Sequence, residues 1–178
     1  MDVTLHIPVR RYVFKYCKTL FGDPWRLTTR HKEGIVLHAM LKRMPHRYEK
    51  YHRDDEILSL QIPAKIVCQK GVYLTQEDID AFNDYIKQVI LDEIFQFHTA
   101  IQSRVGLKAI DKVSVNQYMA DKRVRLIRLQ PAEATKFFWQ KQIITDILSK
   151  YDITEDDLSS DSVVKHLQRY SSARYLAS

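Results

Sequence analysis

The strongest constraint on the fold is a helical pattern that runs from Thr75 to Gly106 with no proline or glycine in between. Thr75 can cap the first free N–H groups of a helix, and Glu77 and Asp78 would lie at its positive end. Apolar side chains then recur with helical spacing, at Ile79, Phe82, Ile86, Val89, Ile90, Phe97 and Ile101. A helix of nearly thirty residues would be roughly 40 Å long, so we expect it to be the central element. Its broad apolar face would also suit a dimer interface.

Short β-like stretches precede this pattern. Residues 3–7 and 58–62 alternate apolar and polar side chains, which is typical of half-buried strands, and Pro8 is expected to end the first of them. Residues 66–68 form a further apolar run. Because 58–62 and 66–68 are close in sequence, we expect that they can pair as a hairpin, although the connection is not a favoured two-residue turn.

Two helices are expected in the same part of the chain. The first begins at Val9 and ends at the turn formed by residues 22–24. The second runs from about 31 to 44, and its inward side chains are predicted to be Ile35, Ala39 and Met40.

The remainder of the chain also favours helices. Helical patterns cover residues 107–121, a segment that starts at Pro131, and a short segment with Val163 and Leu167 inward, preceded by a capped start at Thr154. We therefore predict a predominantly helical α+β protein. A small N-terminal layer of strands and helices would pack on the long central helix, and a helical region would follow. One compact domain, 1–178, is the simplest organisation, with 107–178 as a possible helical subdomain.

Composition excludes several classes of protein. Hydrophobic residues make up 45% of the sequence and charged residues 28%, which excludes a disordered tail or a collagen-like chain. The four glycines are too far apart to form a glycine-rich phosphate loop. The two cysteines are also far apart, and neither a secretory signal nor a long apolar run is present. These features predict an intracellular, cytoplasmic protein that does not enter a membrane.

Positive charge is concentrated in the first third of the chain. The whole sequence has 28 Lys or Arg and 22 Asp or Glu, a formal charge of +6. Residues 1–53 hold twelve basic and four acidic residues (+8), residues 76–121 four and eight (−4), and residues 122–178 ten and seven (+3). A segregated basic region produces a stronger local potential than the same charge spread evenly. Aromatic residues are interleaved with these cations, a mixture that can bind phosphates and unpaired bases.

This distribution predicts a nucleic-acid-binding protein, for DNA or RNA, that contacts phosphates with little base selectivity. Tyr12 and Tyr16 lie on a helical stripe and are interpreted as core residues, whereas Tyr48 and Tyr51 lie in a charged loop and could stack on bases. The predicted phosphate contacts of the basic N-terminal region are Arg10, Arg11, Lys15, Lys18, Arg26, Arg30, Lys32 and Arg47. A second basic cluster adds Lys122, Arg123, Arg125 and Arg128.

Searches for catalytic and metal-binding patterns give no candidate. The segment from Asp152 resembles the start of a calcium loop, but Asp157 replaces its glycine and Val163 replaces its final glutamate. Cysteine and histidine are not spaced as zinc ligands. We therefore expect neither metal nor cofactor and favour a non-enzymatic protein. Two alternatives stay open: a structural or adaptor protein that oligomerises through the long helix, and an enzyme whose pocket has no sequence pattern.

Overall fold

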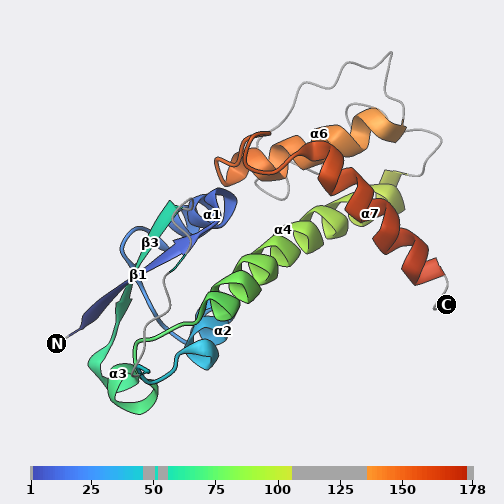
Figure 1. Cartoon of the computed structure of the whole chain (residues 1–178). Helices are drawn as coiled ribbons and strands as arrows, with labels where there is room; N and C mark the ends of the chain where they lie inside the picture. Colours follow the sequence, from blue (N-terminus) through green and yellow to red (C-terminus); the bar gives the residue numbers. More distant parts are fainter. Residues whose placement is uncertain (1, 46–50, 52–55, 106–135, 176–178) are drawn as a thin grey trace. The chain divides into compact units, whose positions relative to one another are not determined.

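The computed structural model describes residues 2–45, 51, 56–105 and 136–175 of the chain (Figure 1). In this described part, three strands form one sheet and six helices supply most of the other secondary structure. The predicted class, a predominantly helical α+β protein, is confirmed. The chain divides into two compact units, Met1–Gln88 and Val89–Ser178. The single domain 1–178 and the helical subdomain 107–178 stay predictions, and the helix expected at 107–121 lies outside the described residues.

The sheet of the N-terminal unit mixes antiparallel and parallel pairing. Its order is β1 (Val3–Val9), β3 (Glu56–Ile62) and β2 (Trp25–Arg26), with β1 antiparallel and β2 parallel to β3. One face is buried, and it carries Ile7, Val9, Trp25, Leu58, Leu60 and Ile62. The expectation that Pro8 ends the first strand is wrong. Because β1 is an edge strand, the missing N–H of Pro8 does not break the sheet.

The predicted hairpin between 58–62 and 66–68 is also wrong, because the second run belongs to helix α3 (Ala64–Lys70). The carbonyl of Pro63 accepts from the N–H groups of Ile66 (2.8 Å) and Val67 (3.1 Å) and so closes the first turn. Gly71 ends the helix with a φ of +101°, a backbone conformation that favours glycine. Good helix formers such as alanine, lysine and glutamine flank the short apolar run and outweigh its β-like residues.

Helices α1 (Arg11–Phe21) and α2 (Lys32–Met40) flank β2 in the sequence. The predicted stripe of α1 is confirmed at its buried residues Tyr12, Val13, Tyr16 and Cys17. The predicted inward face of α2 is wrong, because Ile35 is 51% exposed, Ala39 is exposed and Met40 is half-buried. Gly34, Leu37 and Leu41 are buried instead. Gly34 lies so close to the Thr28 backbone that its face of the helix is the inner one.

The long helix α4 (Gln76–Val105) begins as the sequence predicts. The Asp78 N–H donates to the Thr75 hydroxyl (3.2 Å), and the Thr75 N–H and hydroxyl donate to the Asp78 carboxylate (2.9 and 2.7 Å). Lys42 pairs with the same carboxylate at 2.7 Å. Burial raises the pKa of Asp78, but the bonds from Lys42 and Thr75 outweigh it and hold this pKa below its ordinary value.

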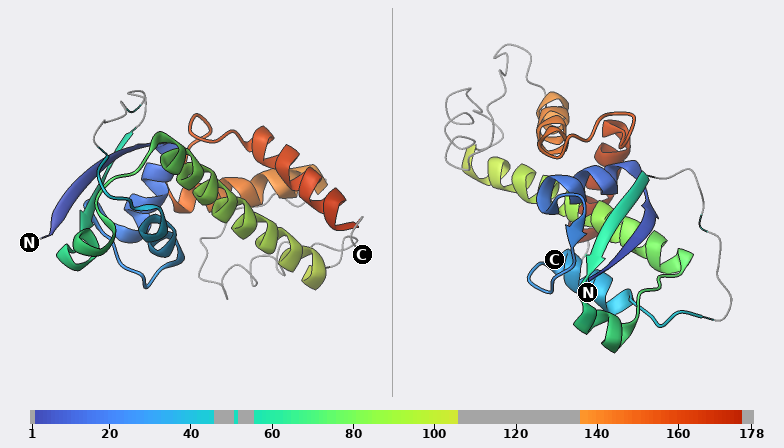
Figure 2. Two further views of the ribbon diagram at one scale, coloured as in Figure 1. Left: turned by 60° about the horizontal axis from the view of Figure 1, so that its bottom comes forward. Right: turned by 90° about the vertical axis from the view of Figure 1, so that its left-hand side faces the viewer.

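Within the N-terminal unit, α1 and the first half of α4 lie over the buried face of the sheet (Figure 2). Asn83 of α4 is fully buried, and its side-chain oxygen accepts from the Arg10 N–H at 3.1 Å. The Tyr12 hydroxyl donates to the Asn83 carbonyl at 3.3 Å. These two bonds join the start of α1 to α4.

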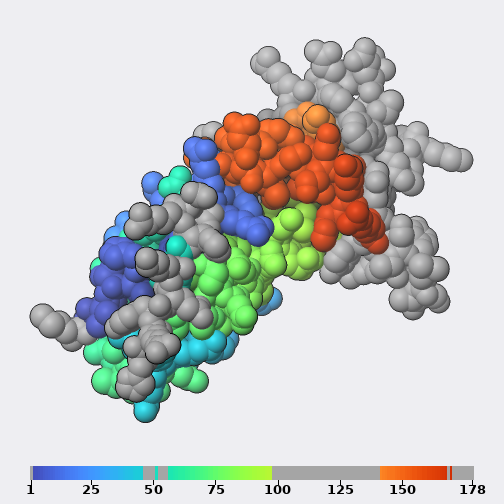
Figure 3. Space-filling view, viewed as in Figure 1, coloured from blue at the N-terminus to red at the C-terminus, as the bar shows by residue number. Residues whose placement is uncertain are grey.

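The C-terminal unit contains α6 (Lys136–Lys150) and α7 (Ser160–Tyr175) together with the second half of α4 (Figure 3). Its apolar core includes Ile94, Ile144, Ile147, Val163 and Leu167. The helix start expected at Thr154 is a turn, in which Thr154 donates to Asp157. Helix α7 begins at Ser160 instead, where the Glu155 carboxylate accepts from the Ser160 N–H at 2.8 Å.

No helix among the described residues is both long enough and apolar enough to cross a membrane.

Candidate functional site

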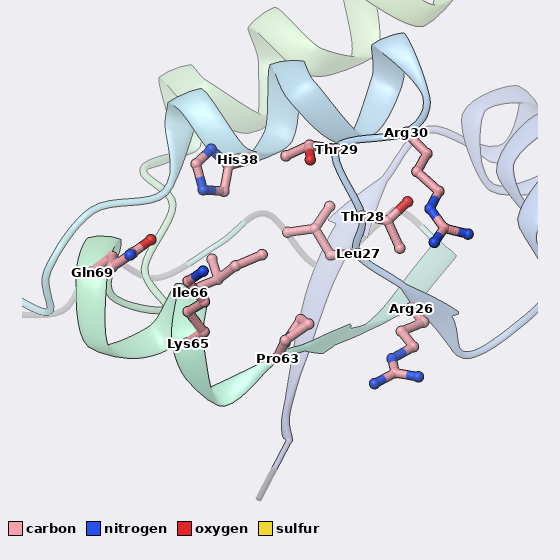
Figure 4. Close-up of a pocket in the computed structure, with 10 residues that line it drawn as sticks. All are labelled: Arg26, Leu27, Thr28, Thr29, Arg30, His38, Pro63, Lys65, Ile66 and Gln69. Carbon is pink, nitrogen blue, oxygen red and sulfur yellow. The ribbon is translucent and has the colours of Figure 1, made fainter.

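The N-terminal unit holds a cavity of about 550 Å³ beside the edge of its sheet (Figure 4). Its walls come from β2 and the loop that follows it, from α2, and from Pro63 and α3. Three cationic side chains, Arg26, Arg30 and Lys65, line it together with His38 and Gln69. We call this site the cationic pocket.

The parallel pairing of β2 with β3 fixes one side of the cationic pocket. Arg26 lies opposite Gln61 in the register, and the Leu27 N–H continues the pairing by donating to the Gln61 carbonyl at 2.9 Å. Leu27 is 1% exposed, which anchors the start of the loop in the core. The same strand pair brings Pro63, directly after β3, into the lining of the pocket.

Helix α2 packs closely against the loop at Thr28, the residue after Leu27. A Cβ built on Gly34 would lie 1.9 Å from the carbonyl oxygen of Thr28, so only glycine permits this approach. The loop is therefore held at Leu27 and Thr28, and it leads through Thr29 and Arg30 into α2. Helix α3 supplies Lys65, Ile66 and Gln69 from one side of its short length (Figure 4).

The polar residues that line the pocket can all donate hydrogen bonds, and no carboxylate is among the lining residues described. Besides its three cations it contains Thr28, Thr29, His38 and Gln69, each of which can donate a hydrogen bond. Arg26 lies 3.6 Å from Asp2 in an ion pair whose side chains are 67% and 41% exposed, and such exposed pairs contribute little. Among the described residues, neither Arg30 nor Lys65 forms an ion pair. This chemistry suits an anion.

Apolar atoms complete the pocket, and they come from Leu27, Pro63 and Ile66. A volume of about 550 Å³ lies within the range of small-ligand sites. The arrangement therefore suits a small anion that also carries an uncharged, partly apolar portion.

The structure separates the cations that the sequence groups together. Arg26 and Arg30 line the cationic pocket, whereas four others lie on or next to α1, and Lys32 begins α2. In the α1 group, Arg10 lies 4.0 Å from Asp84, and Arg11 lies 3.8 Å from Glu56. The other two α1 cations are Lys15 and Lys18. Arg47, Lys122, Arg123, Arg125 and Arg128 lie outside the described residues.

Sequence reasoning missed Lys65, His38 and Gln69 as site residues. Lys65 follows a proline in a segment interpreted as a hairpin, and His38 lies within an ordinary amphipathic helix pattern. No local motif marks either residue. Only the long-range pairing of β2 with β3 brings α3 beside the loop of residues 27–30.

Three of the aromatic side chains near the basic residues belong to the core. Tyr12 and Tyr16 are 4% and 3% exposed, as their place on the helical stripe predicts. Trp25 is 2% exposed and stacks on Phe21 with ring centroids 4.3 Å apart. The Tyr51 hydroxyl donates to the Leu74 carbonyl at 2.9 Å, which gives this side chain a structural role. Tyr48 lies outside the described residues.

The apolar face of α4 is also used within the chain. Ile79, Phe82, Ile86, Ile90 and Ile94 are all fully buried. These five side chains therefore belong to the core of the chain itself, and oligomerisation through the long helix stays a prediction.

The described residues contain no group of three or more metal-ligating side chains. Cys17 is buried, which raises its thiol pKa well above the ordinary value, and Cys68 is exposed on α3. Comparisons with known protein families, with curated proteins and with solved structures find no match to this chain.

Proposed function

We propose that this protein binds nucleic acid and that the cationic pocket holds its phosphates. The observation that carries the proposal is that Arg26, Arg30 and Lys65 all line one cavity, whose described lining contains no carboxylate. Phosphate oxygens are strong acceptors, and arginine and lysine supply charge-assisted hydrogen bonds to them. The +8 charge of residues 1–53 supports the proposal by favouring the approach of a polyanion.

The cationic pocket reduces the number of cations that we propose to contact phosphate directly. Arg26 and Arg30 remain the principal contacts of the N-terminal set, and Lys65 joins them. The cations of α1 would act at longer range, by raising the local potential. Binding through phosphates gives little base selectivity, because phosphate contacts carry no direct sequence information.

Fluorescence anisotropy of labelled single-stranded DNA, single-stranded RNA and duplex DNA tests the proposal. Three contacts between these cations and phosphate oxygens would make binding about 20- to 40-fold weaker at about 200 mM salt than at about 50 mM, since each contact releases about 0.7 to 0.9 counterions. Failure of all three probes to bind at the lower salt would refute the proposed function.

Charge-removing variants locate the contact. Arg30→Gln and Lys65→Gln should each weaken binding by about tenfold and reduce the salt slope by about one. Lys18→Gln is the matched control, because it removes one exposed positive charge from α1 of the same unit. An equal loss of affinity in the control would show that overall charge, and not the cationic pocket, governs binding. Circular dichroism of each variant verifies that the fold is kept.

A further inference from the structure

We infer that the cationic pocket selects a terminal phosphate of a nucleic-acid strand, a phosphate monoester, over the internal diesters. This inference rests on the proposed function and names the part of the nucleic acid that the pocket recognises. It follows from the charge, the hydrogen-bonding capacity and the size of the cavity taken together.

The charge of the pocket exceeds what one internal phosphate can neutralise. Arg26, Arg30 and Lys65 place three formal positive charges around one cavity, and only Arg26 has an acidic neighbour, the exposed Asp2, among the described residues. An internal phosphodiester carries a single negative charge. A terminal phosphate carries about −1.5 to −2 at pH 7 and has three strong acceptor oxygens. The monoester therefore matches the pocket better.

The donors of the pocket also suit three acceptor oxygens better than two. The cations approach from two sides: Arg26 and Arg30 from β2 and its loop, and Lys65 from α3 (Figure 4). The hydroxyls of Thr28 and Thr29 lie on the loop between the two arginines. A diester exposes only two free oxygens and leaves more of these donors without a partner, which is unfavourable once water is displaced.

The size and the apolar lining of the pocket indicate how much of the strand enters. About 550 Å³ is the volume of a small-molecule site rather than of a groove that follows a long strand. Pro63 and Ile66 offer apolar surface beside the cations, against which the sugar or base of one nucleotide can lie. The pocket is thus expected to hold one terminal nucleotide, while the rest of the strand stays outside.

Binding of a short oligothymidylate with a 5′-phosphate, with a 3′-phosphate, or with hydroxyls at both ends tests this inference. We expect at least one phosphorylated form to bind about tenfold more tightly than the dihydroxyl form, because it adds charge and a third oxygen. This advantage should disappear in Arg30→Gln and Lys65→Gln and persist in Lys18→Gln. Equal binding of all three oligonucleotides would overturn the inference and leave the proposed function intact. No binding of any of them would overturn the inference as well, whereas the proposed function is refuted only if the RNA and duplex DNA probes also fail to bind.

Competition experiments distinguish the terminal phosphate of a strand from other molecules that carry the same phosphate group. Thymidine monophosphate and inorganic phosphate should displace the phosphorylated oligonucleotide only at much higher concentration than an unlabelled copy does. Displacement by thymidine monophosphate at the same concentration as the oligonucleotide would show a free-nucleotide site and overturn the strand-end assignment. Tighter binding of a phosphoserine peptide than of the phosphorylated oligonucleotide would overturn it as well.

Discussion

Replacement of Gly34 by alanine tests how firmly the loop of residues 27–30 is held beside the cationic pocket. A Cβ at position 34 would lie 1.9 Å from the carbonyl oxygen of Thr28 and 3.1 Å from its carbonyl carbon. Both atoms belong to the backbone, so rotation of a side chain cannot relieve the overlap. A comfortable carbon–oxygen contact is about 3.3 Å, and the loop or α2 must therefore move by about 1.4 Å.

Two opposing effects decide the result of Gly34→Ala. Alanine is favoured over glycine inside a helix by about 1 kcal/mol. Crowding a closely packed site costs about 1–3 kcal/mol, and more when the backbone has to shift. The required movement is much larger than the few tenths of an ångström by which packed groups can give way. We therefore expect a net loss of about 2 kcal/mol in the free energy of unfolding. The displaced loop carries Arg30, so oligonucleotide binding should weaken as well.

Chemical denaturation followed by tryptophan fluorescence measures the effect, because Trp25 is buried in the same unit. Ile35→Ala is the matched control on α2, since that side chain is 51% exposed and should change stability by about 0.5 kcal/mol or less. Gly22→Ala provides a second comparison. Gly22 has a φ of +82°, but a Cβ added there has no heavy atom within 4 Å. This variant therefore shows the cost of the backbone conformation without a steric overlap. A Gly34→Ala protein as stable as the wild type would refute the close loop–helix contact.

Three further substitutions test the fold and its pH dependence. Asn83→Ala removes the acceptor of the Arg10 N–H and should cost about 1–3 kcal/mol in denaturant unfolding; unchanged stability would contradict that bond. Thr75→Ala should cost about 1 kcal/mol, and Thr75→Ser much less, because the hydroxyl caps α4. Burial raises the pKa of Asp146 to about 7 from an ordinary 3.8, so its stabilising contribution is complete below about pH 4 and is lost as the pH rises through 7. Asp146→Asn should remove this dependence and raise stability at pH 8 by about 1–2 kcal/mol, because solvent partly screens the half-buried side chain; an unchanged stability–pH curve would contradict it.

Local signals in the sequence predict the longest element well. The absence of a breaker and the cap at Thr75 are sufficient for α4, because both act within a few residues of chain. The helical spacing of apolar side chains is another local signal, and it predicts the buried stripe of α1. Such signals fail where packing decides. Gly34 has no apolar side chain to mark its face of α2, yet its close approach to Thr28 makes that face the buried one.

The candidate site is predictable only in part, for a related physical reason. Arg26 and Arg30 are found from the concentration of positive charge, but Lys65 is 35 positions further along the chain than Arg30. Its place in the pocket depends on the parallel pairing of β2 with β3, and two paired residues of β2 give too short a pattern to predict. Charge counting also includes Arg10 and Arg11, which lie near Asp84 and Glu56 instead of in the pocket.

NMR titration can locate the phosphates of a bound nucleic acid in the cationic pocket. Addition of a short single-stranded oligonucleotide to the isotopically labelled full chain at low salt should shift the backbone signals of residues 26–30 and 63–69. The arginine side-chain N–H signals of Arg26 and Arg30 should shift with them, while those of α1 should change far less. Shifts concentrated on α1, or an absence of shifts in the pocket when the oligonucleotide is bound, would contradict the account.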